Sequence, residues 1–288
     1  MIHDGGASKM YTFGLIGYPI KHSLSPWIHE SFLASTDVKG SYSIIEIDPA
    51  ESFSKNMQLL KEKNLNGFNI TVPFKQSIIP FLDELDEEAK RIGAVNTVVH
   101  KDGKWIGYNT DGKGYVRSLM DKYPALESEK ELSLLMIGAG GAARGIYYAL
   151  LAEGFTNIDI TNRTLASAQE LTEFKPVSAN TNIKTLKDAE ETLSDYDVVI
   201  QTTSVGMKPH EGTSIMSLDK LKASCIVSDI VYQPIKTRFL TEAESKGALL
   251  HFGHTMLLYQ AQLAFEIWTN KNIELVELET ALRLQLEG

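Results

Sequence analysis

The chain has 288 residues, of which 43% are hydrophobic and 23% charged, and 28 basic against 37 acidic side chains give a net charge of −9. This composition is that of a globular protein, the acidic balance argues against a nucleic-acid-binding surface, and the length suits about two domains. No apolar run approaches 18 residues, so no membrane span is expected. The single Cys225 excludes a disulfide framework. With no signal-peptide pattern, it favours a reducing, cytoplasmic location.

The first residues differ in character from the rest of the chain. Met1–Lys9 is polar and contains two glycines, which predicts a flexible leader, and Met10 is then the expected native start. The seven histidines show none of the spacings that hold zinc, so no metal is expected.

A serine pair lies near the start of the first predicted helix. Tyr11–Ile16 is predicted as a short strand. Ser25 followed by Pro26 predicts a helix with serine at the N-cap and proline in the first turn. Ser23 and Ser25 then bring two hydroxyl groups beside the free N–H groups of that helix. We interpret the pair as a small carboxylate site; the alternative is plain helix capping.

A second group of polar residues ends a strand. The strand is predicted to end at Val72, with Pro73 at the start of a helix. Asn69 and Thr71 are two positions apart, so their side chains point to the same face. Lys75 falls in the first turn of the predicted helix, where its charge opposes the helix dipole. That unfavourable position suggests a functional role, the alternative being an ordinary solvated lysine.

Further polar residues occur near predicted strand ends. Asn96 lies in a predicted strand, and Thr110 and Asp111 lie where the next strand passes into a helix. Together with Thr71 and Lys75 they are expected to line the ligand crevice of an α/β sheet. The elements predicted around them are the strand Tyr42–Ile47, the helix Pro49–Lys63, the charged helical segment Asp83–Arg91, the strand Gly93–Val99, the hairpin turn Lys101–Lys104, the strand Trp105–Tyr108 and the helix Lys113–Lys122.

A glycine-rich turn follows a strand in the middle of the chain. Leu134–Ile137 is wholly apolar, as expected of a strand in a parallel sheet covered on both faces. Gly138, Gly140 and Ala143 then form the pattern G-x-G-x-x-A around the start of the predicted helix Ala142–Glu153. The first glycine permits the tight turn, the second lets a phosphate approach the backbone, and the small third residue lets the helix pack on the strand. The alternative is an ordinary turn between a strand and a helix.

The residues after the next predicted strand, Asn157–Thr161, indicate which nucleotide binds. An NAD site usually has an acidic residue about 20 positions past the glycines, to accept hydrogen bonds from the ribose. Here the strand leads into Arg163 and Thr164, and the guanidinium of an arginine suits a phosphate. Thr164 is also placed to cap the next helix, and Asp159 lies too early for the ribose role. The pattern favours NADP(H) over NAD(H); the alternative is a solvated surface arginine.

The rest of the chain continues the alternation of strands and helices. We expect two α/β domains, with residues 1–110, completed by the C-terminal helices 254–288, as the substrate-binding domain. Residues 111–253 are expected to form a Rossmann-like, doubly wound nucleotide-binding domain. Cys225 is expected to be a buried core residue. The remaining predicted elements are the helix Leu165–Glu173, the strands Asp197–Thr202 and Val227–Val231, the helix Thr237–Lys246, the strand Ala248–His251 and the helices Thr255–Thr269 and Glu274–Leu286.

Several of these motifs occur together in one known family. The glycine-rich turn, with Asn162-Arg163-Thr164 after the next strand, resembles that of the shikimate dehydrogenase family. The resemblance runs over nearly the whole chain in family order. The other stretches that carry it are Gly17–Pro26, Asn69–Lys75, Gly93–Thr97, Asn109–Gly112, Asp229–Pro234 and Gly253–Gln260.

The resemblance implies reversible reduction of 3-dehydroshikimate to shikimate with NADPH, a step of aromatic amino acid (chorismate) biosynthesis. It also implies that Lys75 and Asp111 form the catalytic pair. The residues implied to bind the substrate are Ser23, Ser25, Asn69, Thr71, Asn96, Thr110, Asp111, Tyr232 and Gln260. Those implied to bind NADP(H) are Glu87, Gly138, Ala139, Gly140, Gly141, Ala142, Asn162, Arg163, Thr164, Ser167, Ile230 and Gly253.

The chemistry of these residue types agrees with the resemblance. Hydride transfer to a ketone leaves an alkoxide, and a lysine hydrogen-bonded to that oxygen can supply the proton and stabilise the charge. Asp111 would orient Lys75 and keep it charged. Two positions depart from the family. Gln201 stands where asparagine is frequent, and His254-Thr255 replaces smaller residues, so details of the nicotinamide pocket stay open.

Two alternatives remain. A quinate or dual quinate/shikimate dehydrogenase, using NAD or NADP, would need a slightly different pocket because quinate carries an extra ring hydroxyl; Arg163 and Thr164 favour the NADP-dependent enzyme. A non-catalytic nucleotide-binding sensor is opposed by the presence of Lys75 and Asp111. A methyltransferase would usually carry an acidic residue after the second strand, and the chain lacks it.

The expected partners are small-molecule substrates, without nucleic acid or membrane, and the expected oligomeric state is a monomer or homodimer.

Overall fold

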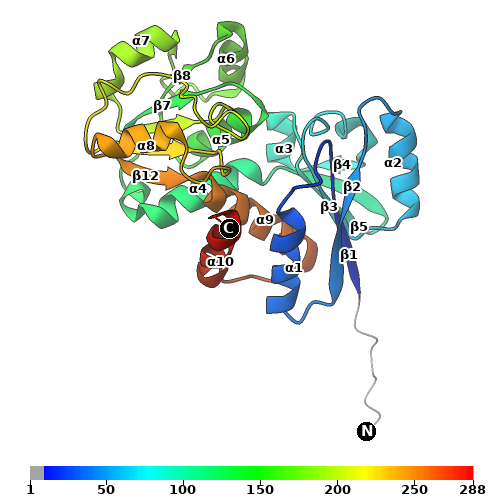
Figure 1. Cartoon of the computed structure of the whole chain (residues 1–288). Helices are drawn as coiled ribbons and strands as arrows, with labels where there is room; N and C mark the ends of the chain where they lie inside the picture. The colour runs from blue at the N-terminus through cyan, green and yellow to red at the C-terminus, as the bar shows by residue number, and fades with distance from the viewer. Residues whose placement is uncertain (1–9, 288) are drawn as a thin grey trace. The chain divides into compact units, whose positions relative to one another are not determined.

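The computed structural model describes residues 10–287, so the predicted leader Met1–Lys9 lies outside the described residues. The chain forms two compact units, each with one six-stranded sheet (Figure 1). The first unit runs to Thr110 and includes Ala261–Glu274, whereas the second comprises Asp111–Gln260 and the segment from Leu275 onward. The predicted α/β class is confirmed. Of the C-terminal stretch assigned to the first domain, the structure places only residues 261–274 in the first unit.

The first unit is built on a mixed sheet with the strand order β2-β1-β3-β5-β6-β4. β1 is parallel to both β2 and β3, whereas β5 is antiparallel to β3 and to β6. The two-residue hairpin between β5 and β6 has positive φ angles at Asp102 and Gly103, as predicted for this turn. The elements are β1 (Tyr11–Gly17), α1 (Ser25–Ser35), β2 (Gly40–Glu46), α2 (Phe53–Glu62), β3 (Gly67–Ile70), a 3₁₀ turn (Ile79–Phe81), β4 (Glu84–Leu85), α3 (Glu87–Ile92), β5 (Thr97–Lys101) and β6 (Lys104–Tyr108).

The helix predicted from Pro73 is wrong. β3 ends at Ile70, and the residues that follow form successive turns closed by hydrogen bonds from Phe74 N to Thr71 O and from Ile78 N to Phe74 O, both 3.0 Å. The carbonyl of Lys75 accepts from Val95 N at 2.8 Å instead of from a helical partner. Lys75 is therefore not in a helical first turn, and the argument from the helix dipole does not apply to it.

Four further boundaries differ from the prediction, and each lies at or near a helix cap. Ser25 is the first residue of α1 and not its cap, which is Leu24. α2 starts at Phe53 because the Ser52 side chain caps it by accepting from Lys55 N. Asp86 caps α3 in the same way, so the helical part of the charged segment starts only at Glu87. α3 then ends at Ile92, with Gly93 as its C-cap in the left-handed region (φ 70°), and β5 begins at Thr97 instead of Gly93.

The second unit has an all-parallel sheet with the order β12-β11-β10-β7-β8-β9. β7 lies at its centre, and the strand order reverses between β7 and β10, as in a doubly wound fold. The elements are α4 (Asp111–Lys122), β7 (Ser133–Ile137), α5 (Gly141–Ala152), β8 (Asn157–Thr161), α6 (Leu165–Leu171), β9 (Ile183–Lys184), α7 (Leu186–Glu191), β10 (Val198–Gln201), β11 (Ile226–Asp229), α8 (Arg238–Ser245), β12 (Leu249–Phe252), α9 (Gly253–Thr269) and α10 (Val276–Glu287), with 3₁₀ turns at Pro124–Glu127, Thr172–Phe174 and Leu193–Asp195.

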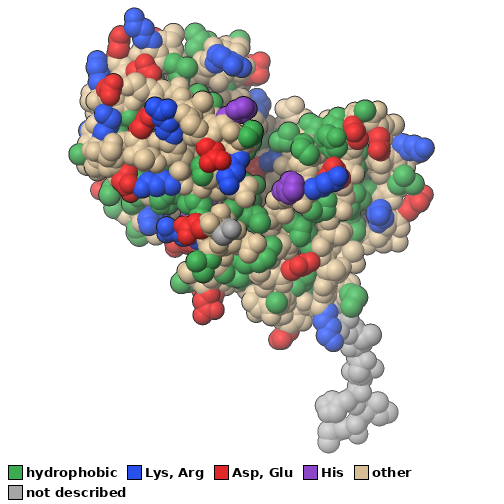
Figure 2. Space-filling model, viewed as in Figure 1, with side chains coloured by type: hydrophobic (Ala, Val, Ile, Leu, Met, Phe, Trp, Pro, Cys, Tyr) green, Lys and Arg blue, Asp and Glu red, His purple; other side chains and the backbone are tan. Residues whose placement is uncertain are grey.

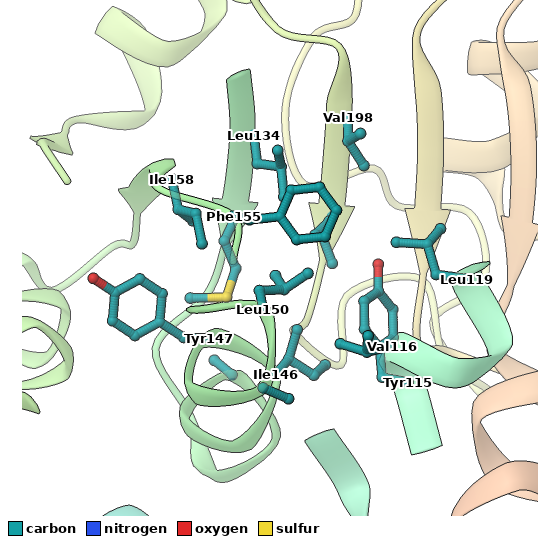
Figure 3. Packing of buried hydrophobic residues seen from close by; sticks show 14 of the residues in the cluster. Tyr115, Val116, Leu119, Leu134, Ile146, Tyr147, Leu150, Phe155, Ile158 and Val198 are labelled. Atoms are coloured by element: carbon teal, nitrogen blue, oxygen red, sulfur yellow. The ribbon is translucent and has the colours of Figure 1, made fainter. Parts of the chain in front are cut away.

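The apolar strands of this sheet are covered on both faces, as predicted. Along β7, Leu134 and Met136 pack in one cluster and Leu135 and Ile137 in another. The first cluster is filled from α4 and α5, and Figure 3 shows residues of both helices meeting β7, β8 and β10. The second cluster is filled largely from α8 and from the segment before β11 that contains Met216, Leu218 and Leu221. Cys225 is buried and unpaired in it, which confirms the prediction for this residue.

The sheet of the first unit carries an aromatic cluster contributed partly by the end of α9. Phe13 of β1 stacks on Trp268 at a centroid distance of 4.6 Å, and Phe265 lies 5.6 Å from Phe32 of α1. The indole of Trp268 donates to Val98 O at 2.8 Å. A Cβ at Gly67 would lie 2.3 Å from the same indole, so only glycine fits there. Residues 261–274 are thus part of the core of the first unit.

Candidate active site

The polar residues of the first unit gather where three strands meet. β5 runs antiparallel to β3 and β6, so its first residue, Thr97, pairs with both Asn69 in β3 and Tyr108 at the end of β6. Asn96 immediately precedes Thr97, and Thr110 follows shortly after Tyr108. Topology therefore brings three residues predicted to bind substrate, Asn69, Asn96 and Thr110, together at the adjoining ends of β3, β5 and β6.

These side chains form one buried hydrogen-bond network. The Asn69 amide donates to Thr97 Oγ1 (3.1 Å) and to Asn96 O (3.2 Å), and the Asn96 amide donates to Thr110 Oγ1 (2.9 Å). Asn96 Oδ1 in turn accepts from Thr110 N at 2.8 Å and from Thr97 Oγ1 at 3.0 Å. All four residues are at most 5% exposed. Such a network fixes the side chains in place before any ligand arrives.

Two residues that the sequence analysis missed extend this network. The Tyr42 hydroxyl donates to Asn69 Oδ1 at 2.8 Å, and the Tyr42 ring stacks on His29 at 4.4 Å with an interplanar angle of 8°. Burial raises the pKa of Tyr42 well above its usual range and lowers that of His29 to about 3, so both are neutral near pH 7. An inward-facing tyrosine between two exposed serines of β2 was the available signal for Tyr42.

The other predicted residues of the first unit lie after strands or at helix starts. Ser23 Oγ accepts from Ser25 N at 3.2 Å, and the two hydroxyls are 3.2 Å apart, so the serine pair is formed at the start of α1. Thr71, next to the end of β3, donates its N–H to Ile16 O at 2.8 Å. Lys75 is half-buried. Glu87, predicted to contact the cofactor, is exposed at the start of α3.

The glycine turn of the second unit has the geometry that its sequence predicts. Gly138 has φ +115°, which favours glycine, and its N–H donates to Thr161 O at 2.8 Å. A Cβ at Gly138 would lie 2.4 Å from the hydroxyl of Thr202, a residue that is itself held by a 2.7 Å bond to Ile137 O. α5 then starts at Gly141, with Gly140 at its N-cap. Strand, turn and helix start follow one another without an intervening loop.

The backbone of this turn is open at two of its glycines. Among the described residues, nothing lies within 4 Å of a Cβ built at Gly140 or Gly141, and both glycines are exposed, so a phosphate can reach the first N–H groups of α5. Ala139 and Ala142 add only methyl groups. Asn162 donates to Thr164 O at 2.8 Å, which shapes the turn after β8, and Arg163 is exposed there. Thr164 is the N-cap of α6, but its side chain makes no capping bond. Ser167 lies half-buried in the next helical turn.

Asp159, which we rejected as a ribose ligand, is occupied elsewhere. Its carboxylate accepts from Tyr196 Oη at 2.8 Å and from Asn182 Nδ2 at 2.9 Å, and it lies 3.2 Å from Lys184 Nζ. These donors lower its pKa although burial opposes them. The residues that follow β8 are Asn162 and Arg163 instead of an acidic residue, which agrees with the preference for NADP(H).

Ile230, which follows β11, and Gly253, which begins α9, are two more predicted cofactor residues that lie in contact. A Cβ at Gly253, the first residue of α9, would lie 2.3 Å from Ile230 O, so the helix start rests directly on the end of β11. Tyr232 follows, half-buried, and burial raises the pKa of its hydroxyl. Gln260 donates to Leu257 O within its own helix at 2.8 Å. Asp111 is 7% exposed at the first position of α4.

The described residues 10–287 contain no cluster of three histidine, cysteine or acidic residues suited to a metal ion. No helix in the same range is long and apolar enough to cross a membrane. On the face shown in Figure 2, basic and acidic side chains are interspersed. This distribution offers no wide basic surface there for nucleic acid.

Comparison with known proteins gives one consistent result. Residues 15–98 match the shikimate dehydrogenase substrate binding domain, residues 123–232 the shikimate/quinate 5-dehydrogenase family and residues 253–283 the shikimate 5′-dehydrogenase C-terminal domain. The chain is 50% identical over 276 residues to the shikimate dehydrogenase (NADP(+)) of Oceanobacillus iheyensis, covering 95% of this chain and 98% of that protein.

Two solved structures are similar over almost their full length. Shikimate dehydrogenase from Aquifex aeolicus has a TM-score of 0.85 and 37% identity, covering 96% of this chain and 99% of that one. Shikimate 5-dehydrogenase from Thermus thermophilus, in complex with NADP(H) and shikimate, has a TM-score of 0.83 and 32% identity with the same coverage.

Proposed function

The chain belongs to the shikimate dehydrogenase family, and we propose that it catalyses the reversible NADP(H)-dependent reduction of 3-dehydroshikimate to shikimate. The observation that carries the proposal is the presence, in one chain, of a preset polar network in the first unit and an open glycine turn followed by Arg163 in the second. The 50% identity to a shikimate dehydrogenase (NADP(+)) over 95% of the chain supports it. The reaction is a step of aromatic amino acid biosynthesis.

The second unit is the proposed cofactor domain. Bound NADPH supplies the hydride. The exposed N–H groups at Gly140 and Gly141 hold its diphosphate, because helix N-termini favour anions and no described side chain stands in the way. Arg163, with Asn162 and Thr164 shaping its turn, binds the 2′-phosphate. Ile230 and Gly253 hold the opposite end of the dinucleotide.

The first unit is the proposed substrate domain. Ser23 and Ser25 bind the carboxylate through their paired hydroxyls, and Asn69, Thr71, Asn96 and Thr110 orient the ring hydroxyls. Lys75 donates the proton to the alkoxide oxygen that forms when the ketone is reduced. Asp111 is the proposed second member of the catalytic pair. Tyr232 and Gln260 complete the set of substrate ligands.

We further propose that the enzyme works in the cytoplasm on these small molecules alone, as a monomer or homodimer. Light scattering coupled to gel filtration measures the oligomeric state directly, and a trimer or larger assembly would contradict the proposed monomer or homodimer.

The deciding experiment follows the absorbance of NADPH after addition of 3-dehydroshikimate, beside reduction of NADP or NAD with shikimate and with quinate. Rapid NADP-linked turnover of shikimate alone is expected. NAD-linked or quinate-linked turnover would replace the proposal with a quinate or dual dehydrogenase. Tight NADPH binding without any turnover would replace it with a nucleotide-binding sensor.

A further inference from the structure

A buried carboxylate ties together the two loops that leave β10 and β11. Asp229, the last residue of β11, is fully buried. Its Oδ1 accepts from Gln201 Nε2 at 3.1 Å and from Val231 N at 2.9 Å, and its Oδ2 accepts from Thr237 Oγ1 at 2.7 Å. Three donors from three different segments therefore converge on one side chain.

Gln201, at the end of β10, extends the connection into the neighbouring loop. Its Oε1 accepts from Thr203 N, while its Nε2 donates to Val205 O at 3.2 Å as well as to Asp229. Gln201 is itself fully buried. An asparagine, frequent at this position in the family, is one methylene shorter and cannot span all three partners from the same backbone position. The longer side chain is thus matched to this network.

Stability alone is a poor reason for a charge at this place. Burial raises the pKa of Asp229 to about 6 despite its three donors, which means that the site disfavours the ionised form. What the carboxylate provides is a fixed geometry for the segments that it joins.

Those segments carry proposed ligand-binding residues. Val231, held through its N–H, lies between Ile230 and Tyr232, so fixing it fixes the backbone of both neighbours. Ile230 O is in turn the surface on which Gly253 rests. A second bond joins the same two loops further out, from Lys208 N to Gln233 O at 3.1 Å. The network is therefore bonded to the backbone next to Ile230, which is one of the proposed cofactor residues.

We propose that Asp229 and Gln201 are positioning residues, which hold the loops after β10 and β11 in the conformation that binds NADP(H). This inference rests on the proposed cofactor of the enzyme but not on its substrate. The two residues act through the backbone of Ile230, Val231 and Thr203 and do not themselves touch the reacting atoms.

The test compares leucine substitutions at the two opposite ends of the strands of the second sheet. Asp229→Leu and Gln201→Leu remove the network. Asp229→Asn keeps an oxygen that accepts from Gln201 and Val231, and its amide N–H can donate to the Thr237 hydroxyl, which reverses that bond. The matched control is Asp197→Leu, since Asp197 just before β10 also accepts from a backbone N–H (Ser133, 2.8 Å) and a side-chain donor (Lys222, 2.6 Å), but at the opposite end of the strand. NADPH affinity is measured by fluorescence titration, and amide hydrogen exchange is measured on the protein without cofactor.

We expect Asp229→Leu and Gln201→Leu each to raise the Kd for NADPH about tenfold, as loss of one well-placed hydrogen bond would. Exchange at Val231 and Thr203 should accelerate, Asp229→Asn should restore affinity to within about twofold, and Asp197→Leu should lower the melting temperature without changing the Kd. If Asp229→Leu does not fold, Gln201→Leu and Asp229→Asn carry the test.

Two results would overturn the inference. One is an unchanged Kd in folded Gln201→Leu and Asp229→Leu, which would make the network merely structural. The other is a wild-type protein that does not bind NADPH at all. A wild type that binds NADPH but does not turn over shikimate would refute the proposed function alone, because the affinity comparison still holds.

Discussion

The proposed ligand-binding residues of the two units differ in burial: those of the first are buried and hydrogen-bonded to one another, whereas the glycines of the second are exposed. In the first, Asn69, Asn96 and Thr110 are almost wholly buried and already bonded to one another. In the second, Gly140 and Gly141 leave the backbone open: apart from the adjacent residues and the backbone of the same helix, no described atom lies within 4 Å of a Cβ at either position. A polyhydroxylated ring is recognised by side chains that have to be set in advance, whereas a diphosphate needs only exposed N–H groups. Substitutions should therefore affect catalysis and cofactor binding separately.

The largest effect is expected for Lys75→Ala. Loss of the proposed general acid should lower the turnover number by roughly 10²–10⁴, the usual span for such a group, with little change in NADPH affinity. Steady-state rates and a fluorescence titration check both halves. Lys101→Ala, at an exposed hairpin lysine of the same unit, is the control. Near wild-type turnover in Lys75→Ala would refute the assignment.

Arg163→Gln tests the second unit in the same way, at the proposed contact with the 2′-phosphate. Removing the proposed partner of the 2′-phosphate should weaken NADPH binding about 10- to 100-fold, as expected for hydrogen bonds to a charged group, while leaving NADH binding unchanged. Titrating both nucleotides against wild type and variant measures this. Lys187→Gln, another exposed cation of the second unit, is the control. Equal losses for NADH and NADPH would exclude the phosphate contact.

Gly138→Ala should damage the glycine turn while leaving the first unit intact. The added methyl would lie 2.4 Å from Thr202 Oγ1 at a φ of +115°, so we expect a loss of about 1–3 kcal/mol in the free energy of unfolding. Urea unfolding measures it. Gly140→Ala, where the space is open, should unfold as the wild type does and lose NADPH affinity instead. Unchanged stability in Gly138→Ala would mean that the turn relaxes without strain.

The smallest effect concerns pH and His29. The pKa of His29 is about 3 when folded and near 6.5 when unfolded, so below pH 6.5 the unfolded chain binds the extra proton. The stabilisation is therefore present above pH 6.5 and is lost as pH falls, by about 1.4 kcal/mol per unit between pH 6 and 4. His29→Phe, which keeps a ring against Tyr42, should remove this slope. Urea unfolding at pH 7.5 and 5.0 tests it.

Two other buried groups titrate in the same range and stay in the variant. The pKa of His251 is also lowered to about 3 by burial, which adds a loss of the same sign on acidification. The raised pKa of Asp229 acts oppositely, because its stabilisation grows as pH falls from 6 towards 4. Only the difference between wild type and His29→Phe isolates His29. An identical pH dependence in both would exclude its contribution.

The comparison also explains what the sequence could predict. The glycine turn was correctly placed, and β8 was predicted with its observed bounds, because both depend on residues adjacent in sequence. Thr97 and Tyr42 were missed, because their role arises from the antiparallel pairing of β3 with β5 and from a side chain that reaches across the sheet. The helix at Pro73 was wrong, since a turn bonded to Val95 replaces it. Gln201 was noted as a departure from the family, but Asp229 was not predicted to be its hydrogen-bond partner.

The contribution of residues 261–274 to the first unit has a consequence for how the protein is made. Translation releases β1 to β6 early, but Phe265 and Trp268 leave the ribosome only near the end. Until then the aromatic face around Phe13 lacks these two rings, and Val98 O lacks its indole donor. The core of the first unit therefore stays incomplete while residues 111–260 of the second unit are being synthesised. The unit that begins first thus receives its last core segment only after residues 111–260 have been made, and a contiguous fragment of the first 110 residues would not be a self-sufficient domain.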